Sequence, residues 1–267
     1  MGQPQPPSRD DISRSEPIVA PPDVEDIPPR VVRATFDVPF TCKFTHRDGM
    51  NTKPTYPVPP VTTLKGLTHA ALEHPSRRQL NIEGGDEYSE ATDRQTQFNK
   101  LTRWGIRNEG GRDGELFPVS EHLSRRFKGE SSGYLSQPVT EEVLIEPTYI
   151  IYIGAPESVA VEIATAFRDP PYPLMLGDSD SPVDIRDIEV CEPSVVQEQG
   201  EVECVVPGVQ DIEQACVLPM EPEPQPEWPR QSPIPAPAEP VTVTGGQVGG
   251  WVEIESSVDL ERFVFID

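Results

Sequence analysis

The sequence lacks several features that would assign it to a common class of protein. No apolar run approaches the ~20 residues that a membrane-spanning helix requires, and the polar, proline-rich amino terminus does not resemble a signal peptide. None of the four cysteines lies in a C-x-x-C pair, and no histidine stands at zinc-ligand spacing from them. The sequence contains no phosphate-binding loop or dinucleotide fingerprint. We therefore expect a cytoplasmic protein with no membrane contact, no metal and no cofactor.

Apolar residues and lysines are also scarce. Hydrophobic residues make up 35% of the 267 positions and 33 positions are proline, so part of the chain should lie outside a packed core. Only 5 of the 22 basic residues are lysine. The net charge of −23 is uneven, because residues 30–130 carry 16 basic and 13 acidic side chains, whereas residues 141–267 carry 4 and 26. This composition fits a salt-rich cytoplasm, as in a halophilic archaeon, or simply an acidic interaction tail.

Alternating hydrophobicity predicts the first element of the fold. From Val32 to Phe44, seven apolar residues alternate with mostly polar ones, a period of two that indicates a strand with one buried face. The preceding residues 1–30 are rich in proline, aspartate and serine and show no periodicity. We expect them to form a disordered arm.

The stretch from Thr55 to Leu72 predicts an extended segment that leads into a helix. Three prolines exclude a helix from its first half, and Thr62 is the expected N-cap of the helix that follows. Helical spacing predicts an apolar face and an exposed face, formed by Leu64, Leu67 and Ala71 and by Lys65, Thr68 and His69 respectively. Gly66 costs a helix roughly 1 kcal/mol relative to alanine, which indicates that another group passes close to its backbone.

The elements that follow come in an order typical of one fold. We predict a polar loop over 76–94, a strand over 95–107, a polar projecting insertion over 115–137, a strand over 139–153, a helix near 156–168 and a strand over 183–190. This order predicts an α+β, ferredoxin-like β-α-β-β-α-β domain over residues 31–190, an arrangement also used by RNA-recognition modules. Residues 191–240 should form an acidic, proline-rich, poorly ordered segment, and 241–267 should form strands that dock on the core through Trp251, Phe263 and Phe265.

The middle of the chain combines basic and aromatic residues. Arginine binds phosphates, and aromatic faces stack on unpaired bases with about 1–3 kcal/mol per base. The basic residues are Arg103, Arg107, Arg112, Arg125, Arg126 and Lys128, and the aromatic residues between them are Trp104, Phe117, Phe127 and Tyr134. They predict a surface for RNA, although a solvated loop that happens to be rich in arginine has the same composition.

The segment Tyr56–Leu72, with the sequence YPVPPVTTLKGLTHAAL, resembles the amino-terminal signature of the CRISPR-associated Cas-five family of the RAMP superfamily. In that family a strand leads into Tyr-Pro-x-Pro-Pro-x-Thr and then into a helix with a Gly-Leu pair. Val139–Ile153 resembles the central strand of the family, and Pro171–Ser179 resembles its Pro-x-x-Leu-Gly-x-Ser turn. The resemblance covers roughly residues 31–190, while the arm and the acidic segment depart from the family.

The resemblance implies a subunit of a type I surveillance complex, Cascade, in antiviral defence. It implies an RNA-recognition-like fold with a projecting β-hairpin thumb at 95–137, binding of the five-prime handle of crRNA, and contacts with the backbone and large subunits. The residues expected to contact RNA are Lys53, Tyr56, Lys65, His69, Arg103, Trp104, Arg107, Arg112, Arg125, Arg126 and Lys128.

Two other functions stay open at this point. Most relatives bind RNA without cutting it, so we expect no catalytic residues. Some relatives are metal-independent ribonucleases that cleave the repeat RNA, and this activity is the alternative function. An acidic scaffold without any RNA contact is the third hypothesis.

Overall fold

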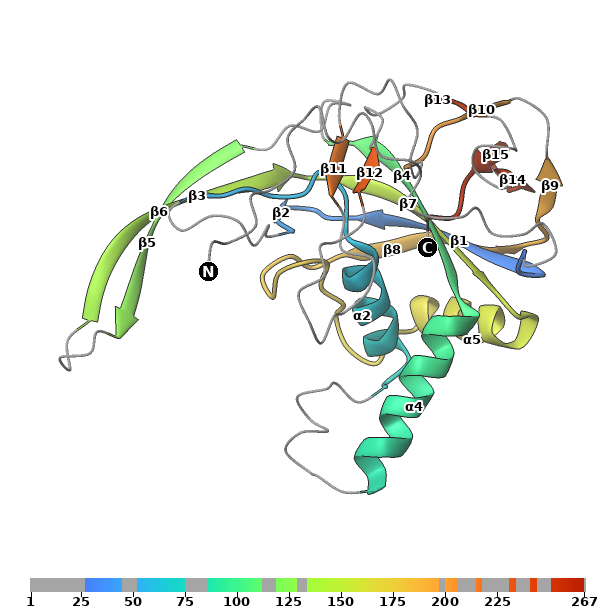
Figure 1. Ribbon diagram of the computed structural model, residues 1–267, viewed down its shortest axis with the longest axis horizontal. Coiled ribbons are helices and arrows are strands. Elements are labelled where there is room, and N and C mark those ends of the chain that lie inside the picture. The colour runs from blue at the N-terminus through green and yellow to red at the C-terminus, as the bar shows by residue number, and fades with distance from the viewer. Residues whose placement is uncertain are drawn as a thin grey trace, which may run out of the picture.

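The computed structural model describes residues 27–44, 52–74, 86–111, 119–128, 134–196, 200–205, 215–217, 231–233, 241–243 and 251–266. The expected arm over residues 1–30 therefore lies largely outside the described residues. The described chain is α+β, with mainly antiparallel sheets and few helices (Figure 1). None of the helices in these ranges is both long and apolar enough to span a membrane.

A four-stranded antiparallel sheet forms the centre of the molecule. Its order is β4-β7-β1-β8, and these strands span Arg103–Gly110, Thr148–Ala155, Arg30–Asp37 and Asp184–Cys191. Six consecutive residues of β1, from Val31 to Phe36, are buried, so both faces of this strand are covered. The prediction of one buried face for β1 is therefore wrong, because the polar positions Arg33 and Thr35 are covered as well.

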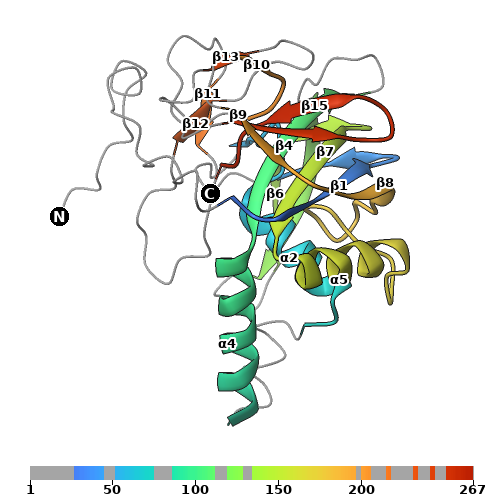
Figure 2. The same ribbon diagram turned by 90° about the vertical axis from the view of Figure 1, so that its right-hand side faces the viewer.

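Two helices cover one face of this sheet. They are α2 (Val61–Ala71) and α5 (Glu157–Arg168), and their apolar residues join β1, β4 and β7 in the larger hydrophobic core (Figure 2). The N-cap of α2 is Pro60 rather than Thr62, with no capping side chain. The carbonyl of Pro60 accepts hydrogen bonds from the N–H groups of Thr63 and Leu64 at 2.8 and 3.2 Å, so the helix begins two residues earlier than predicted.

A third helix, α4, was not predicted. It spans Asp86–Leu101 and extends away from the sheet (Figures 1 and 2). It replaces both the end of the predicted loop and the beginning of the strand predicted over 95–107. The helical pattern of this segment is weak because, of its residues 93–101, Phe98 alone is buried.

The carboxyl-terminal strands close the opposite face of the central sheet. A small sheet with the order β15-β14-β9 contains Leu260–Phe263, Trp251–Glu255 and Ser194–Val196. The ring of Phe263 stacks on Tyr152 of β7, with a centroid distance of 4.0 Å and an interplanar angle of 2°. Phe265 is also buried, whereas the side chain of Trp251 lies outside the described part.

Charged side chains also join the two layers on this face. Glu261 of β15 accepts hydrogen bonds from Arg33, with an Nη2–Oε1 distance of 2.8 Å, and both side chains are 5% exposed. Burial opposes the charge on Arg33, but Glu261 outweighs this effect and holds the pKa of Arg33 above its usual value. The carboxyl-terminal strands are thus joined to the sheet by apolar packing and by a buried ion pair.

A long β-hairpin extends away from the body (Figure 1). Its strands are β5 (Val119–Lys128) and β6 (Tyr134–Ile145), paired over ten positions. The root of β6 also pairs with β2 (Thr41–Cys42) and, in parallel, with β3 (Thr52–Lys53). The predicted insertion 95–137 is therefore divided among α4, β4 and this hairpin.

The predicted acidic segment 191–240 contains short strands. β10 (Gly200–Val202) pairs with β13 (Val241–Val243), and β11 (Ala215–Val217) pairs with β12 (Gln231–Pro233). Near β10, Val205 is buried, and its N–H donates to the carbonyl of Ile106 at 2.7 Å. Part of this segment thus contacts the core through the outer strand β4.

Candidate nucleic-acid interface

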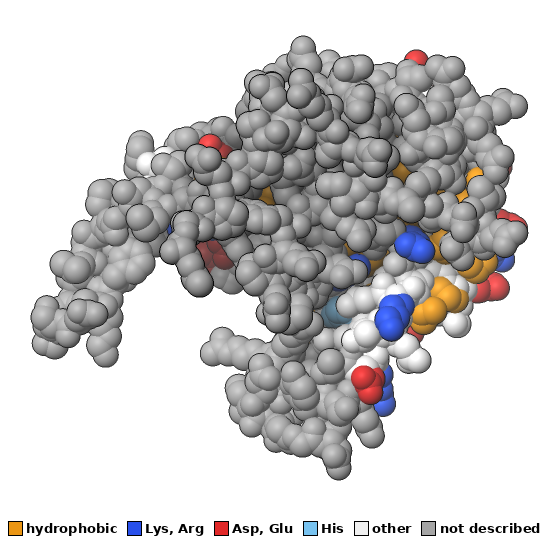
Figure 3. Space-filling model, viewed as in Figure 1, with side chains coloured by type: hydrophobic (Ala, Val, Ile, Leu, Met, Phe, Trp, Pro, Cys, Tyr) orange, Lys and Arg blue, Asp and Glu red, His pale blue; other side chains and the backbone are white. Residues whose placement is uncertain are grey.

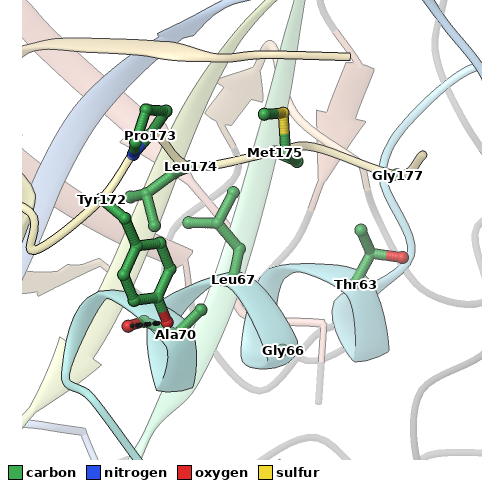
Figure 4. A pocket seen from close by; sticks show the side chains of 9 residues that line it. All are labelled: Thr63, Gly66, Leu67, Ala70, Tyr172, Pro173, Leu174, Met175 and Gly177. Atoms are coloured by element: carbon green, nitrogen blue, oxygen red, sulfur yellow. Dashed lines mark hydrogen bonds between the residues drawn. The ribbon is translucent and has the colours of Figure 1, made fainter. Parts of the chain in front are cut away.

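Two motifs that lie about a hundred residues apart in the sequence form one groove in the structure. The groove has a volume of about 410 Å³ and lies between α2 and the loop that follows α5 (Figure 4). It is lined by Thr63, Gly66, Leu67 and Ala70 from α2 and by Tyr172, Pro173, Leu174, Met175 and Gly177 from the loop. The hydroxyl of Tyr172 donates to the carbonyl of Ala70 at 2.8 Å and so joins the two walls.

Gly66 does not satisfy a steric requirement of the fold. It is exposed, and a methyl group at this position would meet no atom within 4 Å. The predicted close approach to this backbone therefore does not come from the described chain. A close approach of this kind occurs instead at Gly177, which has a φ of +88°. A methyl group there would lie 2.6 Å from the carbonyl oxygen of Lys43.

The groove adjoins an ion-pair network at the root of the hairpin. The Nζ atom of Lys43 lies 2.7 Å from Glu141 Oε2 and 2.9 Å from Asp178 Oδ2. The Nζ atom of Lys53, one of the predicted RNA contacts, lies 3.9 Å from Glu141 Oε1. Lys43, Glu141 and Asp178 were absent from the predicted site, because their partners are far apart in the sequence.

The charges in this network shift one another's pKa values. Burial opposes the charge on Lys43, but Glu141 and Asp178 outweigh this effect and raise the pKa of Lys43. The hydrogen bond from Lys43 in turn lowers the pKa of Asp178. Lys43 and Asp178 are therefore both charged at neutral pH.

Several predicted RNA contacts lie inside the protein. Trp104 is fully buried, and its indole N–H donates to Thr102 Oγ1 at 3.3 Å, so it has no exposed face for stacking on a base. Tyr56 and Lys65 are 6% and 7% exposed. The prediction of an exposed face on α2 is wrong at Lys65 and Thr68, because both side chains are buried.

His69 belongs to a cluster that joins α2 to α4. Its Nε2 atom lies 3.1 Å from the side-chain oxygen of Asn99, and its Nδ1 atom lies 2.9 Å from Nδ1 of His74. The ring also packs on Phe98, with a centroid distance of 4.9 Å. Because Asn99 accepts the Nε2 proton, Nδ1 of neutral His69 accepts the proton of His74. Burial lowers the pKa of His69 to about 4 and also lowers the pKa of His74.

The remaining predicted contacts are spread over two places. Arg103 and Arg107 are half-buried in β4, where Arg107 pairs with Glu109 and lies 2.7 Å from Glu203. Arg112 lies outside the described residues. Arg125, Arg126 and Lys128 lie in the outer half of β5, of which the structure describes the backbone. The predicted contacts whose side chains the structure describes thus do not form one cluster.

Comparisons with known proteins give remote similarities alone. No family model and no curated protein matches the sequence. A CRISPR protein from Archaeoglobus fulgidus matches over 89% of this chain and 100% of that chain, with 9% identity and a TM-score of 0.48. A chain of a CRISPR RNA-guided surveillance complex matches over 57% of this chain, with 14% identity and a TM-score of 0.37. This second match covers 61% of the solved chain.

A third solved structure is a Type III-B Cmr-beta complex bound to cognate target RNA and AMPPnP. One of its chains matches over 65% of this chain and 69% of that chain, with 10% identity and a TM-score of 0.38. Similarities at these levels define neither the fold nor the function of this chain.

Proposed function

We propose that this chain is a non-catalytic subunit of a type I CRISPR interference complex. It binds the five-prime handle of crRNA and contacts the backbone and large subunits of the complex. The observation that carries the proposal is the joining of two motifs, Thr63–Ala70 and Tyr172–Gly177, in one groove next to the root of a projecting hairpin. These motifs are the segments by which the sequence resembles the Cas-five family.

The arrangement of the central sheet supports a ferredoxin-like domain. Read along the chain, its strands are β1, β4, β7 and β8, with α2 and α4 after the first strand and α5 after the third. Their order in space, β8-β1-β7-β4, with antiparallel neighbours throughout, agrees with the β-α-β-β-α-β arrangement. On this reading the β5–β6 hairpin is an insertion between the second and third strands and corresponds to the thumb.

The closed sheet supports a role for the hairpin and the groove in binding RNA. RNA-recognition modules stack bases on aromatic residues of the exposed sheet face. Here Tyr152 of β7 lies under Phe263, and Arg33 of β1 lies under Glu261, so the chain itself covers this face. RNA would therefore have to use other surfaces.

The sequence of the outer hairpin is suitable for binding phosphates. Between residues 122 and 140 it contains Arg125, Arg126 and Lys128 and one acidic residue, Glu130. Elsewhere, on the face shown in Figure 3, the described surface mixes basic, acidic and hydrophobic side chains. The hairpin is therefore the preferred candidate for contacts with the RNA backbone.

The histidine cluster supports binding over cleavage. A metal-independent ribonuclease needs a general base and a general acid close to the scissile phosphate. At neutral pH both His69 and His74 are uncharged because burial lowers their pKa values, and they hydrogen-bond to each other. Neither is therefore suited to act as the general acid.

The main test is a charge reversal in the hairpin. The double variant Arg125→Glu and Arg126→Glu should bind the repeat-derived handle at least roughly tenfold more weakly, with a shallower dependence on salt. Reversal of two exposed arginines of the body, Arg186 and Arg262, changes the net charge equally and is the matched control. Equal binding by both double variants, or no preference of the wild type for the handle over scrambled RNA, would refute the proposal.

Two further measurements address the mode of binding and the alternative function. If stacking and base contacts supply most of the affinity in a salt-rich cytoplasm, the affinity of the wild type for RNA should depend only weakly on salt. A slope equivalent to six or more phosphates, at about 0.7 per contact, contradicts this.

Incubation with repeat RNA in the presence of a chelator tests cleavage. Product that disappears with His69→Ala or His122→Ala would favour the ribonuclease.

A further inference from the structure

One carboxylate lies where the projecting hairpin joins the body. Glu141 pairs in register with Lys53 of β3, and Thr140 pairs with Thr52. Residues 134–139 of β6, which lie nearer the hairpin tip, pair with β5 alone among the described strands. Thr140 and Glu141 are therefore the outermost residues of β6 that pair with a described strand of the body. The side chain of Glu141 therefore lies at the pivot of the hairpin.

The charge of Glu141 is matched from two sides. Its side chain is 1% exposed, and each of its oxygens faces a different lysine, with Oε2 at 2.7 Å from Lys43 and Oε1 at 3.9 Å from Lys53. A buried carboxylate without a cation is strongly unfavourable, so any rotation of the hairpin that moves Glu141 away from Lys43 is opposed. The ion pair thus restricts the direction of the hairpin as well as its attachment.

The same lysine connects the hairpin to the groove. Lys43 also contacts Asp178, which follows the groove residues of the loop after α5. That loop is itself attached to β2, because Leu176 O accepts the thiol hydrogen of Cys42 at 3.1 Å and Ser181 Oγ donates to the carbonyl of Thr41 at 3.0 Å. The path Glu141–Lys43–Asp178 therefore joins the two parts of the candidate interface through a few short contacts.

We infer that Glu141 is a positioning residue that sets the direction of the β5–β6 hairpin relative to the groove between α2 and the 172–177 loop. The inference deepens the proposed function and rests on it for its effect on RNA. An RNA strand that contacts both the hairpin and the groove binds more tightly if the hairpin already has a fixed direction. The free energy of ordering the hairpin then does not reduce the affinity. Glu141 itself does not contact the RNA.

The neighbouring residue provides a matched control. Glu142 lies on the same strand and accepts a hydrogen bond from the backbone N–H of Thr55 at 3.1 Å, through Oε2. In Glu142→Gln the amide oxygen still accepts this bond, so the charge changes and the contact stays. In Glu141→Gln the shape is kept and the buried charge that faces Lys43 and Lys53 is lost.

The first measurement reports the direction of the hairpin without RNA. Two fluorophores are attached through non-canonical amino acids, one at position 132 between the two hairpin strands and one at the exposed Ser158 of α5. Energy transfer between them reports the distance from the hairpin to the body. Glu141→Gln should broaden or shift the distance distribution, and Glu142→Gln should leave it as in the wild type. If Glu141→Gln proves unstable, Lys43→Met and Lys53→Met replace it, with the larger change expected for Lys43→Met because its contact is shorter. An unchanged distribution in the Glu141→Gln or Lys43→Met chain overturns the inference.

The second measurement is handle affinity for the same chains. Glu141→Gln should weaken binding roughly 2- to 30-fold, the range in which residues outside a binding site alter affinity. A changed direction of the hairpin with unchanged handle affinity overturns the positioning role in RNA binding. A changed direction in a protein whose wild type has no preference for handle RNA supports the pivot and refutes the proposed function, so the two failures are distinguishable.

Discussion

The two faces of the central sheet are closed in different ways. On the helix side, residues such as Phe36, Leu64 and Ile163 form an apolar core. On the other side, the apolar contacts of β14 and β15 surround the buried ion pair between Arg33 and Glu261. Apolar packing tolerates many arrangements of similar volume, whereas a buried charge is tolerated in one alignment alone. The helix side should therefore depend on volume, and the opposite side on the correct pairing of two charges.

The largest effect should come from removing one member of the ion pair. Arg33→Met leaves the carboxylate of Glu261 buried without its cation, which should lower the free energy of unfolding by about 3–5 kcal/mol. The double variant Arg33→Met and Glu261→Met should recover most of this loss, because the two buried charges are removed together. Urea unfolding of both variants measures the difference. If the double variant were as unstable as the single variant, the loss of stability would not come from an unpaired buried charge. The proposed difference between the two faces of the sheet would then be wrong.

Loss of volume on the helix side should have a somewhat smaller effect. Leu64 is fully buried in α2, so Leu64→Ala should lower the free energy of unfolding by about 3 kcal/mol through the lost contacts and the remaining cavity. The control is Val161→Ala on α5, where the side chain is 52% exposed and a change below about 0.5 kcal/mol is expected. Thermal unfolding compares the two variants, and equal stabilities would contradict an apolar core beneath α2.

Mild acid should weaken the helix side through His69. The pKa of His69 is about 4 in the folded chain and about 6.5 in an unfolded one, so the unfolded state binds more protons between these values. The contribution to stability is complete above pH ~6.5 and is lost as the pH falls toward 4. Between pH 7 and pH 5 we expect a loss of about 1–2 kcal/mol, allowing for the partial exposure of the ring.

The variant His69→Gln isolates this contribution. It has no titrating ring, so its stability should change less than that of the wild type over the same pH interval, as measured by urea unfolding at each pH. Parallel pH dependences for the two proteins would show that His69 does not account for the loss.

The smallest effect, of opposite sign, is expected at Gly66. Gly66→Ala should raise the free energy of unfolding by up to about 1 kcal/mol, because alanine restricts the unfolded chain and has free space here. Gly177→Ala is the contrasting variant, since its φ is +88° and the carbonyl of Lys43 is only 2.6 Å from the added methyl group. It should be destabilising in the same thermal measurement. Destabilisation by Gly66→Ala would mean that α2 is more crowded than the structure shows.

Predictions based on local periodicity were the most successful part of the sequence interpretation. Helices near 62–74 and 156–168 and strands that begin near Val32 and Val183 correspond to α2, α5, β1 and β8. Helix α4 was missed, because its polar sequence has a weak period. The missed helix also covers one residue of the face of α2 that was expected to be exposed, because Phe98 and Asn99 of α4 lie against His69.

The candidate site was only partly predictable. The motifs around Gly66 and Leu174 were recognised separately, but their meeting in one groove depends on packing between distant segments. The buried carboxylate Glu141 had no sequence signal, because an acidic residue in a polar strand usually faces solvent. Trp104 was assigned to a surface because it lies among arginines, yet its ring is part of the core.

The sequence by itself determined the order of the main strands and two of the helices, because alternation and helical spacing are properties of neighbouring residues. It also located the basic segment within residues 30–130 and the resemblance to a CRISPR-associated family. Tertiary structure alone decided which residues are buried and which charges meet. Arg33 and Glu261 are separated by 228 positions, and Lys43 and Glu141 by 98, so their contacts exist only after the strands that carry them have packed together.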